Sequence, residues 1–187
     1  MLVAAFRMLL ALTLLTGVLY PLAVTGIAQL VFPHQARGSL IVRGGRVLGS
    51  SLIGQPFAAD HYFWSRPSAT TPAYNSMAST GSNLGPLNPA LVETARARLG
   101  ALRVADSTNT APVPVDLVTT SGSGLDPHIS VASALFQVPR VARARGVPEN
   151  LLRETIRHHT TPRTLGLLGE PVVNVLELNL ALDGEGR

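Results

Sequence analysis

Residues 8–32, MLLALTLLTGVLYPLAVTGIAQLVF, decide the fold, because this stretch contains no charged side chain. As a helix rising about 1.5 Å per residue, it is long enough to cross a bilayer. The remaining residues, about 150 in number, are rich in Gly and Pro and suffice for one domain with its own core. The sequence therefore predicts an α/β (α+β) domain anchored by one N-terminal transmembrane helix.

A cleaved secretory signal is the rival interpretation of this stretch. Arg7 would be its charged region, residues 8–20 its apolar region and Gly26-Ile27-Ala28 its cleavage site. The apolar run continues through Phe32, past the usual length of a signal peptide, which favours an uncleaved anchor.

Charge counting leaves the orientation of the helix open. Only Arg7 precedes it, whereas Arg37, Arg43 and Arg46 follow it, and the positive-inside rule taken alone would keep the domain in the cytoplasm. Long domains, however, cross membranes largely regardless of such charges.

One face of the anchor combines small and hydroxyl residues with a proline. Thr13 and Gly17 lie four residues apart, and Tyr20 and Pro21 follow one turn later. Small and hydroxyl side chains let helices approach closely in lipid, so this face is predicted to contact a partner protein. Pro21 removes one backbone donor and is expected to kink the helix.

Composition excludes several classes of chemistry. The 15 basic residues are all Arg and there is no Cys. Without Lys there is no Walker A loop and no Schiff-base lysine, and without Cys there is no disulfide or thiolate metal site. The basic residues are dispersed and aromatic residues make up only 5% of the chain, so nucleic acid is not an expected partner.

Several elements are predicted from local patterns. Residues 39–43 and 46–49 flank Gly44-Gly45 as a β-hairpin. A helix runs from Pro89 to about Val104 behind an Asn88 cap, and residues 115–120 suggest a buried strand.

The C-terminal third is predicted to be mostly helical. Ser130 caps a helix that Pro139 interrupts or restarts and that ends at Gly146, and another helix begins at Pro148. The last segment favours a helix over residues 175–183, capped by Asn174, although its alternating leucines also fit a strand.

Two loops carry the remaining candidate residues. Residues 62–88 lack periodicity but contain Trp64, which indicates a loop packed on the domain. Residues 121–130 contain Ser123, Asp126 and His128, the residue types of a nucleophilic site, so a membrane-tethered hydrolase is the alternative function. The spacing matches no nucleophile elbow, and a turn at Asp126-Pro127 is favoured.

Taken together, several phrases resemble the KdpC family, the C subunit of the bacterial Kdp potassium-transporting P-type ATPase. They cover nearly the whole chain: YPLAVTGIAQ, FPHQARGSLI, IGQPF, YFWSRPSAT, GSNLGPLNP, VPVDLVTTSGSGLDPHIS, QVPRVARARGV and GEPVVNVLELNLALD. The departures are Ser65, where Gly is expected, and Arg37, where Asn is expected.

The resemblance implies a topology and a set of partners. Residues 1–7 would be a short cytoplasmic N-terminus, residues 8–32 the transmembrane helix and residues 33–187 an extracytoplasmic domain on the periplasmic side of the inner membrane. The partners would be a channel-like potassium-binding subunit, a P-type ATPase subunit and a small single-span subunit, with membrane lipid around the anchor.

The resemblance also implies a non-catalytic role in assembly, and action as a catalytic chaperone that raises the ATP affinity of the pump. It makes Gln137 a possible nucleotide contact, with no firmly bound cofactor and ATP acting only through the complex. A domain outside the membrane cannot touch a cytoplasmic nucleotide, so its effect would be a coupling free energy of about 1–3 kcal/mol. Alternatively, the domain would cover the mouth of the channel-like subunit and stabilise the assembly.

Partner contacts are expected on the anchor face and on the two loops. The predicted contact residues are Thr13, Gly17, Tyr20, Pro21, Trp64, Arg66, Asn83, Asp126 and His128.

Overall fold

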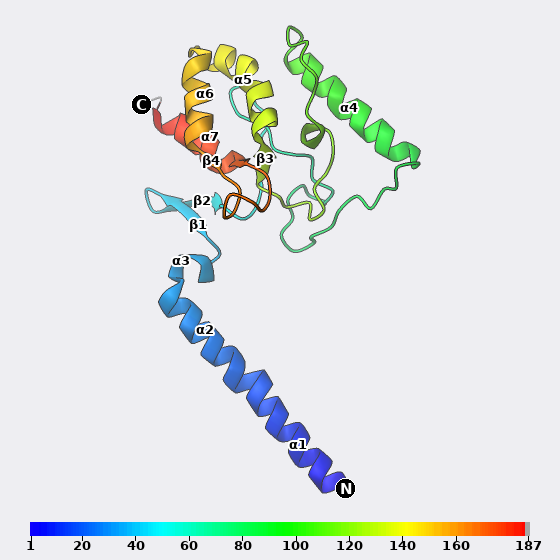
Figure 1. The fold of residues 1–187 in the computed structure, drawn as a ribbon, viewed down its shortest axis with the longest axis vertical. Helices are drawn as coiled ribbons and strands as arrows, with labels where there is room; N and C mark the ends of the chain where they lie inside the picture. The colour runs from blue at the N-terminus through cyan, green and yellow to red at the C-terminus, as the bar shows by residue number, and fades with distance from the viewer. Residues whose placement is uncertain (186–187) are drawn as a thin grey trace. The chain divides into compact units, whose positions relative to one another are not determined.

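The computed structural model describes residues 1–185. The chain divides into two compact units, which meet between Ser50 and Ser51. The first unit contains the apolar helix and a hairpin, and the second is a mixed helix and sheet domain (Figure 1). The predicted fold class, an α+β domain preceded by one helix of membrane-spanning length, is confirmed.

The first unit begins with a helix of 30 residues, Leu2–Val31, that is long and apolar enough to cross a membrane. It consists of α1 (Leu2–Leu14), a π-helical turn η1 (Leu15–Leu19) and α2 (Tyr20–Val31). The helix starts six residues earlier than the uncharged stretch, because Arg7 fits into its first turns. The π turn ends two residues before Pro21, whose nitrogen cannot donate to the preceding turn.

A short helix α3 (Pro33–Ala36) and a β-hairpin complete this unit. Strands β1 (Leu40–Arg43) and β2 (Arg46–Ser50) pair antiparallel with an irregularity between Ile41 and Val42. Gly44 and Gly45 have φ angles of 58° and 75°, the left-handed values that a two-residue hairpin turn needs. The predicted hairpin is therefore confirmed.

Four helices in the second unit agree with the sequence patterns. They are α4 (Pro89–Ala105), α5 (Val131–Arg145), α6 (Glu149–His158) and α7 (Val175–Glu185). Asn88 caps α4 by accepting from the Ala90 N–H at 3.0 Å, and Ser130 caps α5 by accepting from the Ser133 N–H at 3.0 Å. Asn174 accepts from the Glu177 N–H at 3.2 Å, so the helical interpretation of the last segment is confirmed.

The predicted break at Pro139 is wrong, because α5 continues through it to Gly146, where φ is 67°. The proline removes one helical hydrogen bond, yet the residues on both sides of it are held by packing. Ala134, Val138 and Val141 are all buried in the main core.

A small antiparallel sheet joins distant parts of the second unit. Its strands are β3 (His128–Ser130), β4 (Thr160–Thr161) and β5 (Val172–Asn174), in the order β3-β5-β4. Strands of two or three residues are too short to show an alternating pattern, so the sequence did not reveal them.

The predicted strand over residues 115–120 is wrong. Val115–Leu117 form a 3₁₀ turn, η2, in which Leu117 is buried and Val115 is 69% exposed. Between them, Asp116 accepts from the backbone N–H and the hydroxyl of Ser130, at 2.8 and 3.1 Å. The turn is therefore fixed by one buried leucine and one carboxylate rather than by strand pairing.

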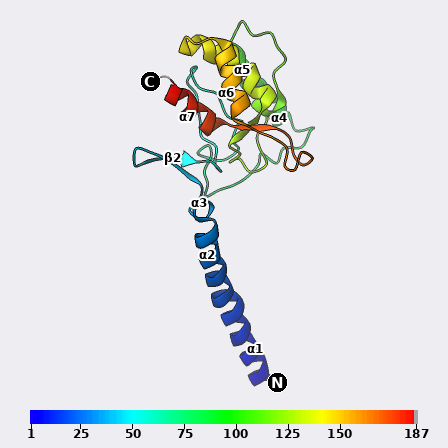
Figure 2. The same ribbon diagram turned by 60° about the vertical axis from the view of Figure 1, so that its left-hand side comes forward.

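Two hydrophobic clusters form the core. The larger lies among α5, α6, α7 and the sheet, with these three helices side by side in both ribbon views (Figures 1 and 2). The smaller contains Trp64, Leu102 of α4 and Leu117. Phe63 belongs to the first cluster and Trp64 to the second, because successive side chains of an extended segment point in opposite directions.

Candidate functional site

Residues 62–88 and 121–130 pack together as one continuous region, the two-loop surface. The Thr80 N–H donates to the Ser123 carbonyl at 2.9 Å, and the Ser68 hydroxyl donates to the Gly124 carbonyl at 2.6 Å. Gly124 has a φ of 68°, and a Cβ there would lie 2.6 Å from the Thr80 carbonyl oxygen. The two loops are therefore packed against each other in a defined conformation, as the aromatic side chains within 62–88 indicated.

Arg66, Asp126 and His128 form a polar cluster within this surface. Arg66 lies 3.2 Å from one carboxylate oxygen of Asp126, and the other oxygen accepts from the His128 N–H at 3.0 Å. The ring Nδ1 of His128 is 3.3 Å from that same oxygen. The three side chains are 24%, 28% and 37% exposed, and a partner contact by them stays a prediction.

The electrostatics of this cluster keep Asp126 ionised. Burial raises the pKa of the Asp126 carboxyl, but hydrogen bonds from His128 and the charge of Arg66 outweigh it, so the net pKa is lowered. The cluster thus presents a fixed carboxylate between two donor groups, an arrangement suited to polar recognition.

The hydrolase alternative requires Ser123 to bond with a base. The Ser123 hydroxyl instead accepts from the Leu125 N–H at 3.1 Å, as in a tight turn. Within residues 1–185 no hydrogen bond joins Ser123 to His128, which is paired with Asp126. The structure brings Asp126 and His128 together but does not align a nucleophile with them.

Gln137 is a buried residue of α5 whose side chain is hydrogen-bonded to the two-loop surface. Its side-chain oxygen accepts from the Trp64 N–H at 2.8 Å, and its side-chain nitrogen donates to the Trp64 carbonyl at 3.1 Å. Asn179 of α7 makes the same pair of bonds with Phe63, at 2.9 and 3.0 Å. Gln137 and Asn179 are each 1% exposed. Nucleotide contact by Gln137 stays a prediction, and it would compete with these bonds.

Trp64 is enclosed by this arrangement and only 8% exposed. Arg140 stacks over its ring at 4.3 Å from the centroid and donates to the Asp60 carbonyl at 2.6 Å. Burial lowers the pKa of Arg140 to about 10, so the guanidinium stays charged at neutral pH. A partner contact by Trp64 stays a prediction, and the present packing leaves little of the ring accessible.

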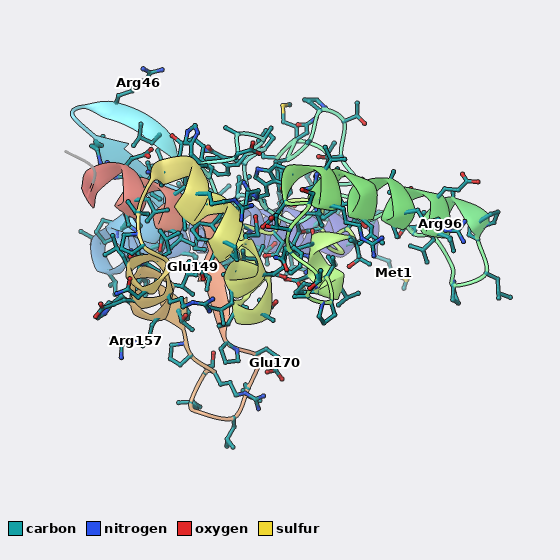
Figure 3. The ribbon with its side chains drawn as sticks, turned by 90° about the horizontal axis from the view of Figure 1, so that it is seen from above. Met1, Arg46, Arg96, Glu149, Arg157 and Glu170 are labelled. Carbon is teal, nitrogen blue, oxygen red and sulfur yellow. The ribbon has the colours of Figure 1, made fainter. Side chains whose placement is uncertain are left out.

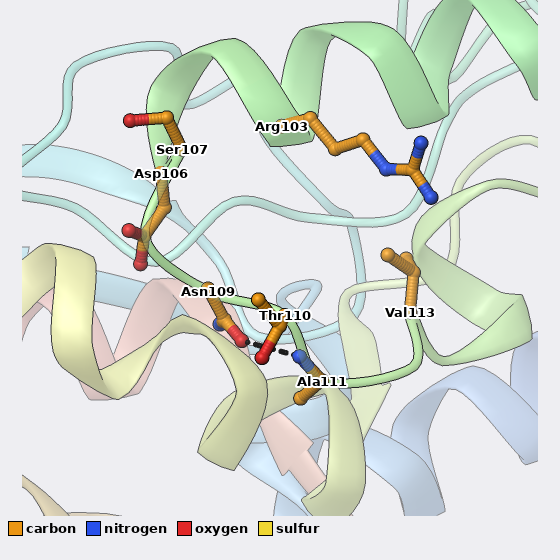
Figure 4. Close-up of a pocket in the computed structure, with 7 residues that line it drawn as sticks. All are labelled: Arg103, Asp106, Ser107, Asn109, Thr110, Ala111 and Val113. Carbon is orange, nitrogen blue, oxygen red and sulfur yellow. Dashed lines mark hydrogen bonds between the residues drawn. The ribbon is translucent and has the colours of Figure 1, made fainter.

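A cavity of about 390 Å³ lies after the end of α4 (Figure 4). Asp106 lines it with a side chain only 4% exposed, and one carboxylate oxygen accepts from Arg143 at 2.5 Å and from Thr108 at 2.9 Å. The other oxygen has no hydrogen-bond partner among the described residues. Asn109 also lines the cavity, and its side-chain oxygen accepts from the Ala111 N–H at 3.0 Å (Figure 4).

Comparison with known proteins decides the family. The family model described as "K+-transporting ATPase, c chain" (KdpC) matches residues 2–184. A potassium-transporting ATPase KdpC subunit of Sorangium cellulosum is 64% identical over 96% of this chain and 95% of its own length. Proteins of the same name from Methylococcus capsulatus and Ralstonia nicotianae are 61% and 60% identical, each over 96% of this chain and over 95% and 88% of their own lengths. The chain belongs to the KdpC family.

The anchor face of this KdpC-family chain is fully exposed. Thr13, Gly17, Tyr20 and Pro21 all lie on the surface of the helix. A Cβ on Gly17 would meet the Thr13 methyl at 3.9 Å, so the two positions share one face. Their use as a partner contact stays a prediction, as does that of Asn83, which is exposed in a loop with a φ of 52°.

One surface feature, residues 163–170, was not expected from the sequence and is called the leucine loop. Leu165, Leu167 and Leu168 are 88%, 80% and 64% exposed. Thr164 and Leu168 exchange backbone bonds of 2.9 and 3.0 Å, and Arg163 binds both carboxylate oxygens of Glu170. The loop, which carries the Glu170 label in Figure 3, is thus a closed turn that presents three leucines to solvent. The signal in the sequence was the phrase LGLLG over residues 165–169, in which three leucines are interspersed with the turn formers Gly166 and Gly169.

Proposed function

We propose that this chain is a non-catalytic accessory subunit of an ATP-driven potassium uptake complex. The main support is the family match over residues 2–184. In addition, the chain aligns with most of the length of relatives that are named as KdpC subunits of potassium-transporting ATPases. Residues 1–185 contain one helix of spanning length, too few to enclose an ion path. The sequence also has no lysine for a phosphorylation motif that requires one.

In this proposal the helix stays uncleaved in the bacterial inner membrane and the domain lies on the periplasmic side. The partners are a channel-like potassium-binding subunit, a P-type ATPase subunit and a small single-span subunit. The anchor face, the two-loop surface and the leucine loop are the proposed contact regions. Exposed apolar patches on an otherwise well-packed domain are what assembly surfaces look like.

The proposed effect on ATP affinity acts through the partners. A domain outside the membrane has no access to the cytoplasmic nucleotide, and the Gln137 amide is already hydrogen-bonded within the core. Stabilisation of one conformation of the pump by contacts would change its affinity for ATP by linkage.

Co-purification tests the proposal. The full-length chain, and a version that starts at Pro33 and is exported by a separate signal, would each be expressed with the candidate partners. We expect only the full-length chain to be retained in detergent with all three and to restore potassium-stimulated ATP hydrolysis. Failure of both versions to associate with any of these subunits would overturn the accessory role.

A matched pair of anchor variants sharpens this experiment. Gly17→Leu fills the proposed contact face, whereas Gly26→Leu adds the same side chain where the structure has open space. We expect the first to weaken retention and the second to leave it unchanged, with equal amounts of both in the membrane. Equal retention of the two variants would remove the anchor face from the interface.

A further inference from the structure

The net positive charge of the chain comes entirely from its first unit, residues 1–50. Residues 1–50 contain Arg7, Arg37, Arg43 and Arg46 and no Asp or Glu, whereas residues 51–187 contain eleven Arg and eleven acidic residues. The whole formal net charge of +4 therefore belongs to the unit that carries the spanning helix. Three of its four arginines lie within 15 residues of Val31, where that helix ends.

The hairpin in the same unit exposes an apolar face. Val42 pairs with Val47 across the strands, and Leu40 lies two residues before Val42 on the same side. Leu40, Val42 and Val47 are 43%, 56% and 54% exposed. Soluble domains rarely leave neighbouring apolar side chains so accessible to water.

A hollow of about 390 Å³ adjoins this face. It is lined by Leu40 and Val42 of the hairpin and by Pro33, His34 and Arg37 of the segment that leaves the helix. The hollow thus joins apolar walls to a guanidinium at the point where the chain emerges from its spanning helix. Arg37 has no ion-pair partner in residues 1–185, and neither has Arg46, which projects from the hairpin tip (Figure 3).

We infer that the segment Pro33–Ser50 is a docking surface for anionic phospholipid. Leu40, Val42 and Val47 enter the boundary between headgroups and acyl chains, and Arg37 and Arg46 bind headgroup phosphates. Lipid is the ligand we infer because this segment continues directly from the spanning helix: α3 begins two residues after that helix ends. The hairpin is therefore held close to the membrane interface. Basic residues beside an exposed apolar face are the combination that holds a segment in the membrane interface.

This inference rests on the proposed membrane anchorage but needs no partner subunit. It is therefore tested on the full-length chain alone, reconstituted in nanodiscs of phosphatidylglycerol and phosphatidylcholine in equal parts. A chain without Cys accepts a single engineered thiol, so Val47→Cys can carry a bimane fluorophore. Bromine atoms on the acyl chains of one lipid at a time report which lipid contacts the fluorophore.

We expect strong quenching at Val47→Cys, and stronger quenching by brominated phosphatidylglycerol than by brominated phosphatidylcholine. The same label at Val104→Cys, 86% exposed on α4, should be quenched much less. Replacement of two interfacial arginines should reduce the preference for the anionic lipid at least about fivefold. Arg37→Gln with Arg46→Gln makes this change, and Arg96→Gln with Arg103→Gln is the matched control on α4.

Three results would overturn the inference. Quenching at Val47→Cys no greater than at Val104→Cys would show that the hairpin does not enter the interface. Equal quenching by the two lipids would remove the headgroup role of the arginines. Quenching at Val47→Cys that disappears when partner subunits are added would assign this face to a protein partner instead. Loss of co-purification with potassium-pump subunits would leave the lipid result intact, so the two proposals fail separately.

Discussion

At the scale of single residues, two buried side-chain amides make the backbone hydrogen bonds that a neighbouring strand would otherwise supply. Phe63 and Trp64 lie in a segment without regular structure, yet each has its N–H and carbonyl bonded by one side chain, from Asn179 and Gln137. A buried backbone group without a partner costs about 1–3 kcal/mol, so these amides allow the aromatic pair to enter the core.

Gln137→Ala is expected to lower the free energy of unfolding by about 2–4 kcal/mol, because it leaves both Trp64 backbone groups unpaired and opens a small cavity. Denaturant unfolding of the full-length chain in detergent, followed by the fluorescence of Trp64, measures this change. Gln35→Ala, on the exposed α3, is the control and should stay within about 0.5 kcal/mol. A Gln137→Ala variant of unchanged stability that weakens ATP use by the complex would favour the nucleotide-contact hypothesis instead.

Gly124→Ala is expected to destabilise the two-loop surface. The new Cβ would lie 2.6 Å from the Thr80 carbonyl oxygen, at a φ of 68° that disfavours side chains. Together these effects should cost about 2–4 kcal/mol. Gly122→Ala, two residues away with nothing within 4 Å of its new Cβ, should be close to neutral. Thermal unfolding of both variants provides the comparison, and equal melting temperatures would contradict the packing of the two loops.

Asp106 should make stability depend on acid pH. Burial raises the pKa of its carboxyl, but hydrogen bonds from Arg143 and Thr108 outweigh it and hold the net pKa below 3.8. A lowered folded pKa means that the stabilisation is present above pH 3.8 and is lost as the pH falls through the folded value. Asp106→Asn should therefore lower the melting temperature at pH 7 and flatten its decline in acid. A variant that retains the wild-type acid profile would contradict this role.

At the scale of elements, α5 connects the main core to the loops. Its buried side supplies Ala134, Val138 and Val141 to the core, while Gln137 and Arg140 reach the segment 60–64. These contacts explain how the helix tolerates Pro139. The stabilisation lost with one backbone hydrogen bond is smaller than that gained from the buried side chains before and after the proline.

The leucine loop is expected to act in assembly and not in folding. Leu165→Ser combined with Leu167→Ser removes two apolar side chains that are 88% and 80% exposed, so thermal unfolding should change little. The backbone bonds between Thr164 and Leu168 remain, and the loop keeps its shape. Retention of partner subunits should fall at least about tenfold if both leucines fill a pocket on a partner.

Val104→Ser is the control for this surface, since Val104 is 86% exposed on α4. It should leave both stability and assembly unchanged. Normal assembly of the double leucine variant would exclude the loop from the interface.

At the scale of the whole molecule, the chain combines a charged anchoring unit with a domain whose charges cancel. If its contacts favour one state of the pump, the presence of this chain should raise the affinity of the complex for ATP by about 5–150-fold, the range of typical coupling free energies. ATP titrations of the partner subunits with the full-length chain present and with it absent would measure this. An ATP affinity independent of the chain would leave it a purely assembling subunit.

The amino-acid sequence by itself determined the features that depend on neighbours along the chain. Residues 8–32 determined a helix of membrane-spanning length by their apolar character, and Gly44-Gly45 determined the hairpin. Asn88, Ser130 and Asn174 marked helix starts through their own side chains. The family phrases likewise determined membership, because they are long and specific.

Only the tertiary structure decided what depends on contacts between distant residues. The three-stranded sheet, the continuity of α5 through Pro139 and the 3₁₀ turn at residues 115–117 all depend on packing that no local pattern contains. The same holds for the site: Arg66 and Asp126 are 60 residues apart in sequence, and Gln137 and Trp64 are 73 apart. A hydrogen bond or ion pair over such a separation forms only when the fold brings its partners together, since local propensity favours neither residue over other polar positions.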